Sequence, residues 1–114
     1  MFRKLIYAGL ALIATACVEP SAPLPLDITI TSDKSTIVAG DSVRFEIHSQ
    51  GTALISLEVI YGDGDSYEAD LADVRTADAS LRHIFETTGT FNVVAMVTQR
   101  NGDAKQASMQ ILVQ

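Results

Sequence analysis

The apolar residues between positions 27 and 113 recur with a period of two, and this alternation limits the possible fold more than any other feature. Successive side chains of a β-strand point to opposite faces, so the alternation indicates strands with one buried face. The expected inward sets are Val43, Phe45 and Ile47; Ile55, Leu57, Val59 and Tyr61; Leu81, His83 and Phe85; Phe91, Val93, Ala95 and Val97; and Met109, Ile111 and Val113. Glycine-containing turns separate these segments, including Asn101-Gly102, which is typical of a hairpin. The sequence therefore predicts an all-β sandwich or barrel.

One segment, residues 69–79 (A-D-L-A-D-V-R-T-A-D-A), departs from the alternation. Its alanines favour a helical turn, whereas its three aspartates suit a loop that passes between the sheets. The sequence leaves both interpretations open.

The first 26 residues have a different composition. A basic start with Arg3 and Lys4 precedes an uncharged run at positions 5–16. As a helix this run would be about 18 Å long, against roughly 30 Å for the hydrocarbon core of a bilayer. It is too short for a transmembrane helix and typical of the core of an export signal, so we expect residues 1–16 to be a signal peptide.

The chain has a single cysteine, Cys17, directly after this run. Residues 13–17 (I-A-T-A-C) resemble a lipobox, in which the cysteine sulfur accepts a diacylglycerol before cleavage, although Ala14 stands where leucine is preferred. The alternative is an ordinary secreted protein, because A-T-A also suits an ordinary signal peptidase. We expect a lipid-anchored protein of the cell envelope, held in the membrane by acyl chains on Cys17. Val18 follows the cysteine, where an aspartate is absent, and this resembles the default pattern for lipoproteins of the outer membrane. We therefore expect the protein on the outer membrane, at either its periplasmic or its surface face.

Residues 17–26 contain all three prolines of the chain. Such a segment favours an extended polyproline II conformation and works as a tether. We therefore divide the chain into a signal peptide (1–16), a lipidated cysteine with a Pro-rich linker (17–26) and one domain (27–114). Removal of residues 1–16 leaves six basic against fourteen acidic side chains, a formal charge of −8. This charge repels phosphate backbones and argues against a nucleic-acid partner.

Two motifs in the domain are similar to a known family. Residues 59–64 (V-I-Y-G-D-G) resemble the W-D-F-G-D-G signature of polycystic kidney disease (PKD) domains, and residues 83–93 resemble their H-x-Y and P-G-x-Y-x-V motifs. Residues 38–45 are similar to the first hairpin of the family. Val59 replaces its tryptophan, Ile60 its aspartate, and Phe85 and Phe91 its tyrosines.

The resemblance implies an immunoglobulin-like β-sandwich of about seven strands that serves as a spacer, adhesion or ligand-contacting module. The residues matching the motifs, which we expect to be structural, are Tyr61, Gly62, Asp63, Gly64, His83, Phe85, Gly89 and Phe91. Gly62 and Gly64 would permit a tight turn, in which the Asp63 carboxylate accepts backbone N–H groups. We expect the His83 ring to be half-buried and bonded to a backbone group.

The acidic stretch that begins at Asp63 and Asp65 offers an alternative, a calcium site, because Ca²⁺ binds oxygen ligands. The stretch lacks a complete ligand set, so we expect no bound metal and no cofactor. With two histidines, no second cysteine and no nucleophile motif, the sequence assembles neither a zinc site nor a catalytic set.

The preferred hypothesis is a monomeric, non-catalytic interaction or adhesion module that contacts an unidentified protein or glycan. The alternatives are a structural spacer or accessory subunit of an envelope complex and, more remotely, a calcium-binding domain or an accessory module of an extracellular enzyme.

Overall fold

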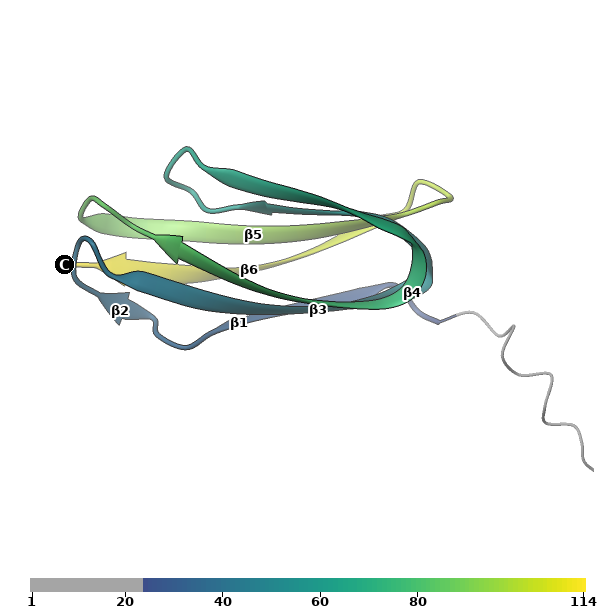
Figure 1. Cartoon of the computed structure of the whole chain (residues 1–114), viewed down its shortest axis with the longest axis horizontal. Coiled ribbons are helices and arrows are strands. Elements are labelled where there is room, and N and C mark those ends of the chain that lie inside the picture. Colours follow the sequence, from purple (N-terminus) through teal and green to yellow (C-terminus); the bar gives the residue numbers. More distant parts are fainter. Residues whose placement is uncertain (1–23) are drawn as a thin grey trace, which may run out of the picture.

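A computed structural model describes residues 24–114, and every regular element in that part of the chain is a β-strand (Figure 1). The strands are β1 (Asp27–Ser32), β2 (Thr36–Ile37), β3 (Ser42–Ile60), β4 (Ser66–Ile84), β5 (Gly89–Gln99) and β6 (Ala104–Val113). The all-β prediction is confirmed. The signal peptide at 1–16, the lipidation of Cys17 and most of the linker at 17–26 lie outside the described residues.

Two long strands, β3 and β4, bend so that each contributes to both layers of the fold (Figure 1). Residues 42–50 of β3 pair with β1 and with residues 76–84 of β4, which makes the first layer. Residues 54–60 of β3 pair with β5, and residues 56–60 also pair with residues 66–70 of β4; β6 and β2 complete this second layer. The described chain thus has six continuous strands rather than the expected seven or so, because these two serve both layers.

Residues 69–79 lie within β4, so both earlier interpretations of this segment, a helical turn and a loop, are wrong. Pairing with β3 overrides the local preferences of alanine and aspartate. The bend falls at Ala72 and Asp73, which have φ angles of 55° and 66°. The Asp70 carboxylate accepts a hydrogen bond from the Ala72 N–H at 2.9 Å, which supports the bent backbone.

The hydrophobic core lies between the two layers and follows most of the predicted alternation. Val43, Phe45 and Phe85 are fully buried, and β5 buries every second residue from Val93 to Gln99. The prediction for Ile55 is wrong, since Leu54 occupies the buried position and Ile55 is only half-buried. The pairing of β3 with β5 shifts between Leu54 and Ser56, which makes Ile55 the extra residue of a β-bulge.

The chain enters the domain at one end of the sandwich. Leu26 packs against the hydrophobic core, and the Gln50 side-chain amide donates a hydrogen bond to the Pro25 carbonyl at 3.1 Å. We call this the entry end. The far end, where the C-terminus lies, carries loops 38–41, 61–65 and 85–88 (Figure 1). The Gly40 N–H donates to the Phe85 carbonyl at 2.8 Å and joins two of these loops.

Candidate functional site

The site is built on the turn that connects β3 to β4 at the far end. Gly62 and Gly64 have φ angles of +89° and +103°, a region that side chains with a Cβ rarely adopt. The Tyr61 N–H donates to the Asp65 carbonyl at 3.1 Å and closes the turn. The Asp65 N–H donates to Asp63 Oδ1, also at 3.1 Å, which is the carboxylate-to-backbone bond expected for Asp63. These bonds fix the direction of the Asp63 side chain.

A second constraint acts on Gly62 from the neighbouring strand. A Cβ atom at this position would lie 2.6 Å from the carbonyl oxygen of Asn92 in β5. A Cβ at Gly64 would meet no heavy atom within 4 Å. Gly62 therefore allows both the turn and its close approach to β5, whereas Gly64 allows only the turn.

His83 reaches the turn from the end of β4. Its Nε2 lies 2.7 Å from Asp63 Oδ2, and the two side chains are 11% and 15% exposed. His83 is half-buried, as expected, but the expectation of a backbone partner is wrong. Partial burial raises the pKa of Asp63, but the hydrogen bonds from His83 and from the Asp65 N–H outweigh that effect and leave the pKa below its usual value. Asp63 is therefore a carboxylate, and His83 Nε2 donates the hydrogen bond.

Aromatic rings hold the imidazole in place. The Tyr61 ring stacks on His83 with centroids 3.8 Å apart and planes within 2°, and Phe85 meets His83 edge-on at 4.8 Å. Phe91, the next motif residue, packs on Phe85 with centroids 5.2 Å apart. Burial raises the pKa of the Tyr61 hydroxyl, and the nearby Tyr67, Asp63 and Asp65 raise it further. The aromatic motif residues thus pack together beside the histidine and restrict the orientation of its ring.

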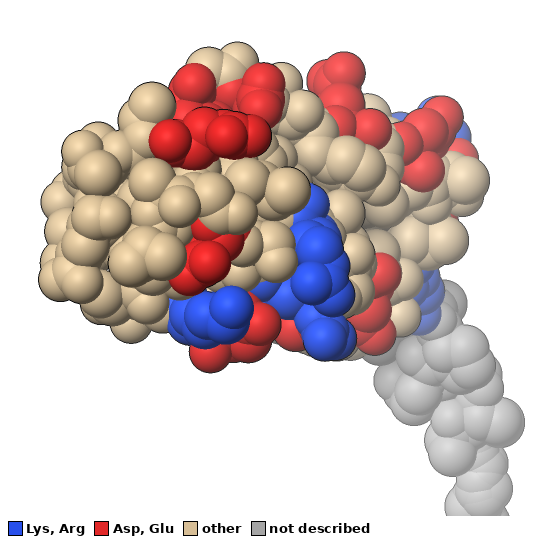
Figure 2. Space-filling model, turned by 60° about the vertical axis from the view of Figure 1, so that its left-hand side comes forward, with Lys and Arg blue, Asp and Glu red and all other residues tan. Residues whose placement is uncertain are grey.

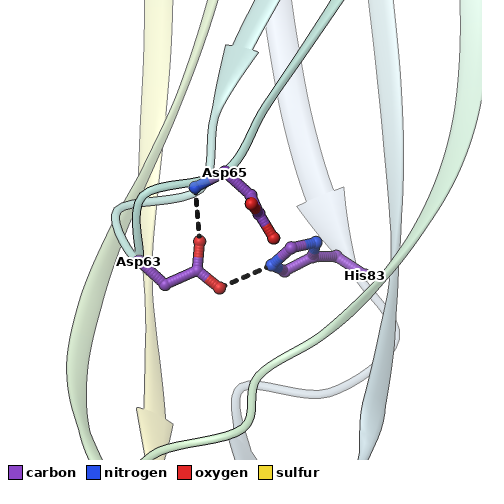
Figure 3. A group of neighbouring side chains, drawn as sticks. All are labelled: Asp63, Asp65 and His83. Atoms are coloured by element: carbon purple, nitrogen blue, oxygen red, sulfur yellow. Dashed lines mark hydrogen bonds and ion pairs between the residues drawn. The ribbon is translucent and has the colours of Figure 1, made fainter.

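Asp65 completes a group of three side chains (Figure 3). Its carboxylate points toward the imidazole of His83, and one ligand atom from each of Asp63, Asp65 and His83 lies within 4.8 Å of the other two. The three line an open recess of about 440 Å³ together with Arg82, Ile84, Glu86 and Thr87. We call it the far-end recess. Carboxylate oxygens and an imidazole nitrogen in this arrangement can hold a metal ion.

The sequence identified Asp63 and Asp65 as possible ligands but not His83 as their partner. The histidine follows 20 residues later, beyond the whole of the bent strand. His48 does not join the group, because its ring pairs with Asp78 on the exposed surface of the first layer. Gly89, another motif residue, begins β5 with a φ of +142°. Cys17 lies outside the described residues.

The surface around the far end is mixed in charge. Figure 2 shows acidic side chains in several separate clusters, with basic side chains gathered in a patch and a strip between them. Each of the two histidines is hydrogen-bonded to an aspartate.

In residues 24–114, no helix has the length and apolar character needed to cross a membrane.

No known family profile and no curated protein sequence match the chain. Several solved structures do match its fold. The PKD domain of an M14-like peptidase from a Thermoplasmatales archaeon superposes with a TM-score of 0.68 at 15% identity, covering 81% of this chain and 98% of that domain. The PKD domain of the human receptor SorCS2 gives a TM-score of 0.59 at 16% identity over 95% of this chain and 84% of that one.

A third similar structure is the CARDB domain of the PF1109 protein from Pyrococcus furiosus, solved in complex with di-metal ions. Its TM-score is 0.57 at 13% identity, over 82% of this chain and 94% of that domain. The protein therefore has the PKD-type, immunoglobulin-like β-sandwich fold that the sequence motifs predict.

Proposed function

We propose that the chain is a lipid-anchored protein of the cell envelope, and that its PKD-like domain is a non-catalytic module that contacts a protein or glycan. The signal-like run at 5–16 and the single cysteine in a lipobox-like context support the anchor. The fold shared with PKD and CARDB domains supports a binding or spacing module over an enzyme.

One observation carries the proposal of a contact function. The chain enters the domain at one end, through Leu26 and the Gln50–Pro25 hydrogen bond, and the far-end recess lies at the other. An anchor that precedes Leu26 would leave the far end facing away from the lipid. Loops on a rigid β-scaffold are the usual place for contact residues. The far-end loops are held by several backbone hydrogen bonds, so a partner would meet a preformed surface.

A structural spacer or accessory subunit is the second candidate. The packing of Leu26 against the core favours a spacer, because a fixed junction holds the domain at a defined orientation to the linker. The two candidates differ in where they touch other molecules. A contact module engages its partner at the far end, whereas a spacer leaves the far end free or uses the whole sandwich surface.

Metabolic labelling with a fatty-acid analogue tests the anchor. We expect the wild-type protein to be labelled and to sediment with membranes, and Cys17→Ala to be unlabelled. A matched Ser21→Ala variant, which changes the linker but not the cysteine, should behave like the wild type. An unlabelled, soluble wild-type protein would contradict the lipoprotein proposal.

A further inference from the structure

We infer that Asp63, Asp65 and His83 form a binding site for a divalent transition-metal ion, with Zn²⁺ as the best fit. The inference does not depend on the lipid anchor or on a protein partner. It rests on three side chains from two elements, the β3–β4 turn and the end of β4, that converge at the wall of one recess (Figure 3).

The ligand types select the class of metal. Ca²⁺ takes about six to eight oxygen ligands, and Mg²⁺ keeps an octahedral shell rich in water. An imidazole nitrogen with two carboxylates suits Zn²⁺, which binds nitrogen and oxygen at about 2.0–2.2 Å. Three protein ligands with a fourth position open to solvent is a common zinc arrangement. Here the fourth position would face the far-end recess.

The distances require only local adjustment. Ligand atoms around a tetrahedral zinc ion are about 3.3–3.5 Å apart. The Asp63–His83 pair, at 2.7 Å, would open slightly as the metal replaces the proton between them. Asp65 would close in from a separation of at most 4.8 Å. Its carboxylate accepts no hydrogen bond from any residue in the described part of the chain, so this movement breaks none.

The surroundings already hold two of the ligands in place. The Asp65 N–H bonds Asp63 Oδ1 and leaves Oδ2 for a metal, and the Tyr61 and Phe85 rings fix the plane of the imidazole. Outer contacts of this kind orient ligands and raise metal affinity. The charge balance also favours a cation, because two carboxylates share the site and the nearby Arg82 guanidinium donates to Ser42 Oγ instead.

Titration calorimetry with ZnCl₂ on the full-length protein in detergent, after removal of bound metal, tests the inference. We expect one saturable site per chain with micromolar affinity, and at least about tenfold weaker binding for Asp65→Asn. Asp65 makes no side-chain hydrogen bond in the described structure, so this variant should fold. The matched control is Glu86→Gln, which removes one negative charge from the same recess and should bind Zn²⁺ like the wild type.

Two further measurements separate this site from other sources of binding. Cys17→Ala should retain the affinity, which excludes the cysteine as the ligand. Co²⁺ in place of Zn²⁺ should give the visible absorption of a tetrahedral ion in the wild type and lose it in Asp65→Asn. The inference is overturned if the wild type shows no saturation below about 1 mM. It is also overturned if Asp65→Asn binds like the wild type, if Glu86→Gln or Cys17→Ala weakens binding as much, or if Ca²⁺ binds more tightly than Zn²⁺.

Discussion

Replacing Gly62 by alanine should destabilise the domain much more than the same replacement at Gly64, although the two residues share one turn. Both have strongly positive φ angles, so both variants carry the backbone cost of about 1–2 kcal/mol that a Cβ imposes in this region. Only the Gly62→Ala side chain meets the Asn92 carbonyl, at 2.6 Å. That overlap forces the turn or β5 to move by several tenths of an ångström.

Overpacking of this kind costs about a further 1–3 kcal/mol. We therefore expect a loss of about 2–5 kcal/mol for Gly62→Ala and about 1–2 kcal/mol for Gly64→Ala. Urea titrations followed by circular dichroism measure both free energies of unfolding, and equal slopes with urea would show that the denatured states are comparable. Two losses that agree within about 0.5 kcal/mol would refute the reasoning, because the contact with Asn92 would then not constrain the turn.

Four further predictions test other parts of the structure. Asp63→Ala should cost about 1–3 kcal/mol near neutral pH in urea titrations, through lost hydrogen bonds. Because the folded-state pKa of Asp63 lies below its usual value, its contribution is present above the unfolded pKa of about 3.9 and fades as the pH falls through the folded pKa. The difference from wild type should therefore shrink as the pH falls below the unfolded pKa and through the lower folded one, and a constant difference would contradict the sign. Leu54→Ala should cost about 2–5 kcal/mol of stability, whereas Ile55→Ser should cost under about 1 kcal/mol. A larger loss for Ile55→Ser would mean that Ile55, and not Leu54, is the buried residue, as the simple alternation predicts. Ala72→Gly should raise the free energy of unfolding by about 0.5–1 kcal/mol, since glycine accepts the φ of 55°. A clear loss of stability would mean that the strand bends at another residue. Millimolar CaCl₂ should leave the melting temperature unchanged, and a rise of several degrees would favour the calcium alternative.

The alternation of apolar residues predicted most of the core because each strand buries one face. Phe45, Val93 and Ile111 are buried as their spacing requires. The Asn101-Gly102 turn also joins β5 to β6 as predicted, and the Gly102 N–H donates to the Gln99 carbonyl. These features depend on short-range geometry, which the local sequence encodes.

The errors arise where distant parts of the chain decide the structure. Ile55 changes face because a bulge adds one residue to β3, and a period of two carries no sign of the insertion. Residues 69–79 become a strand only because β3 offers a pairing partner. The His83 ring bonds Asp63 rather than a backbone group, since the bend of β4 returns it to the turn. The aspartates of the candidate site and His83 lie in separate parts of the sequence, so the motif around either one does not predict the contact between them.

Site-specific photo-cross-linking in cells tests the central claim most directly. A photoreactive residue placed at Thr87, in the far-end recess, should form a discrete cross-link to an envelope component. The matched position is Asn101, an exposed residue in the β5–β6 turn near the entry end, which should form none. A contact module predicts cross-links at Thr87 that disappear when Cys17→Ala releases the protein from the membrane. Equal cross-linking at the two positions, or none at Thr87, would contradict the account and favour a spacer.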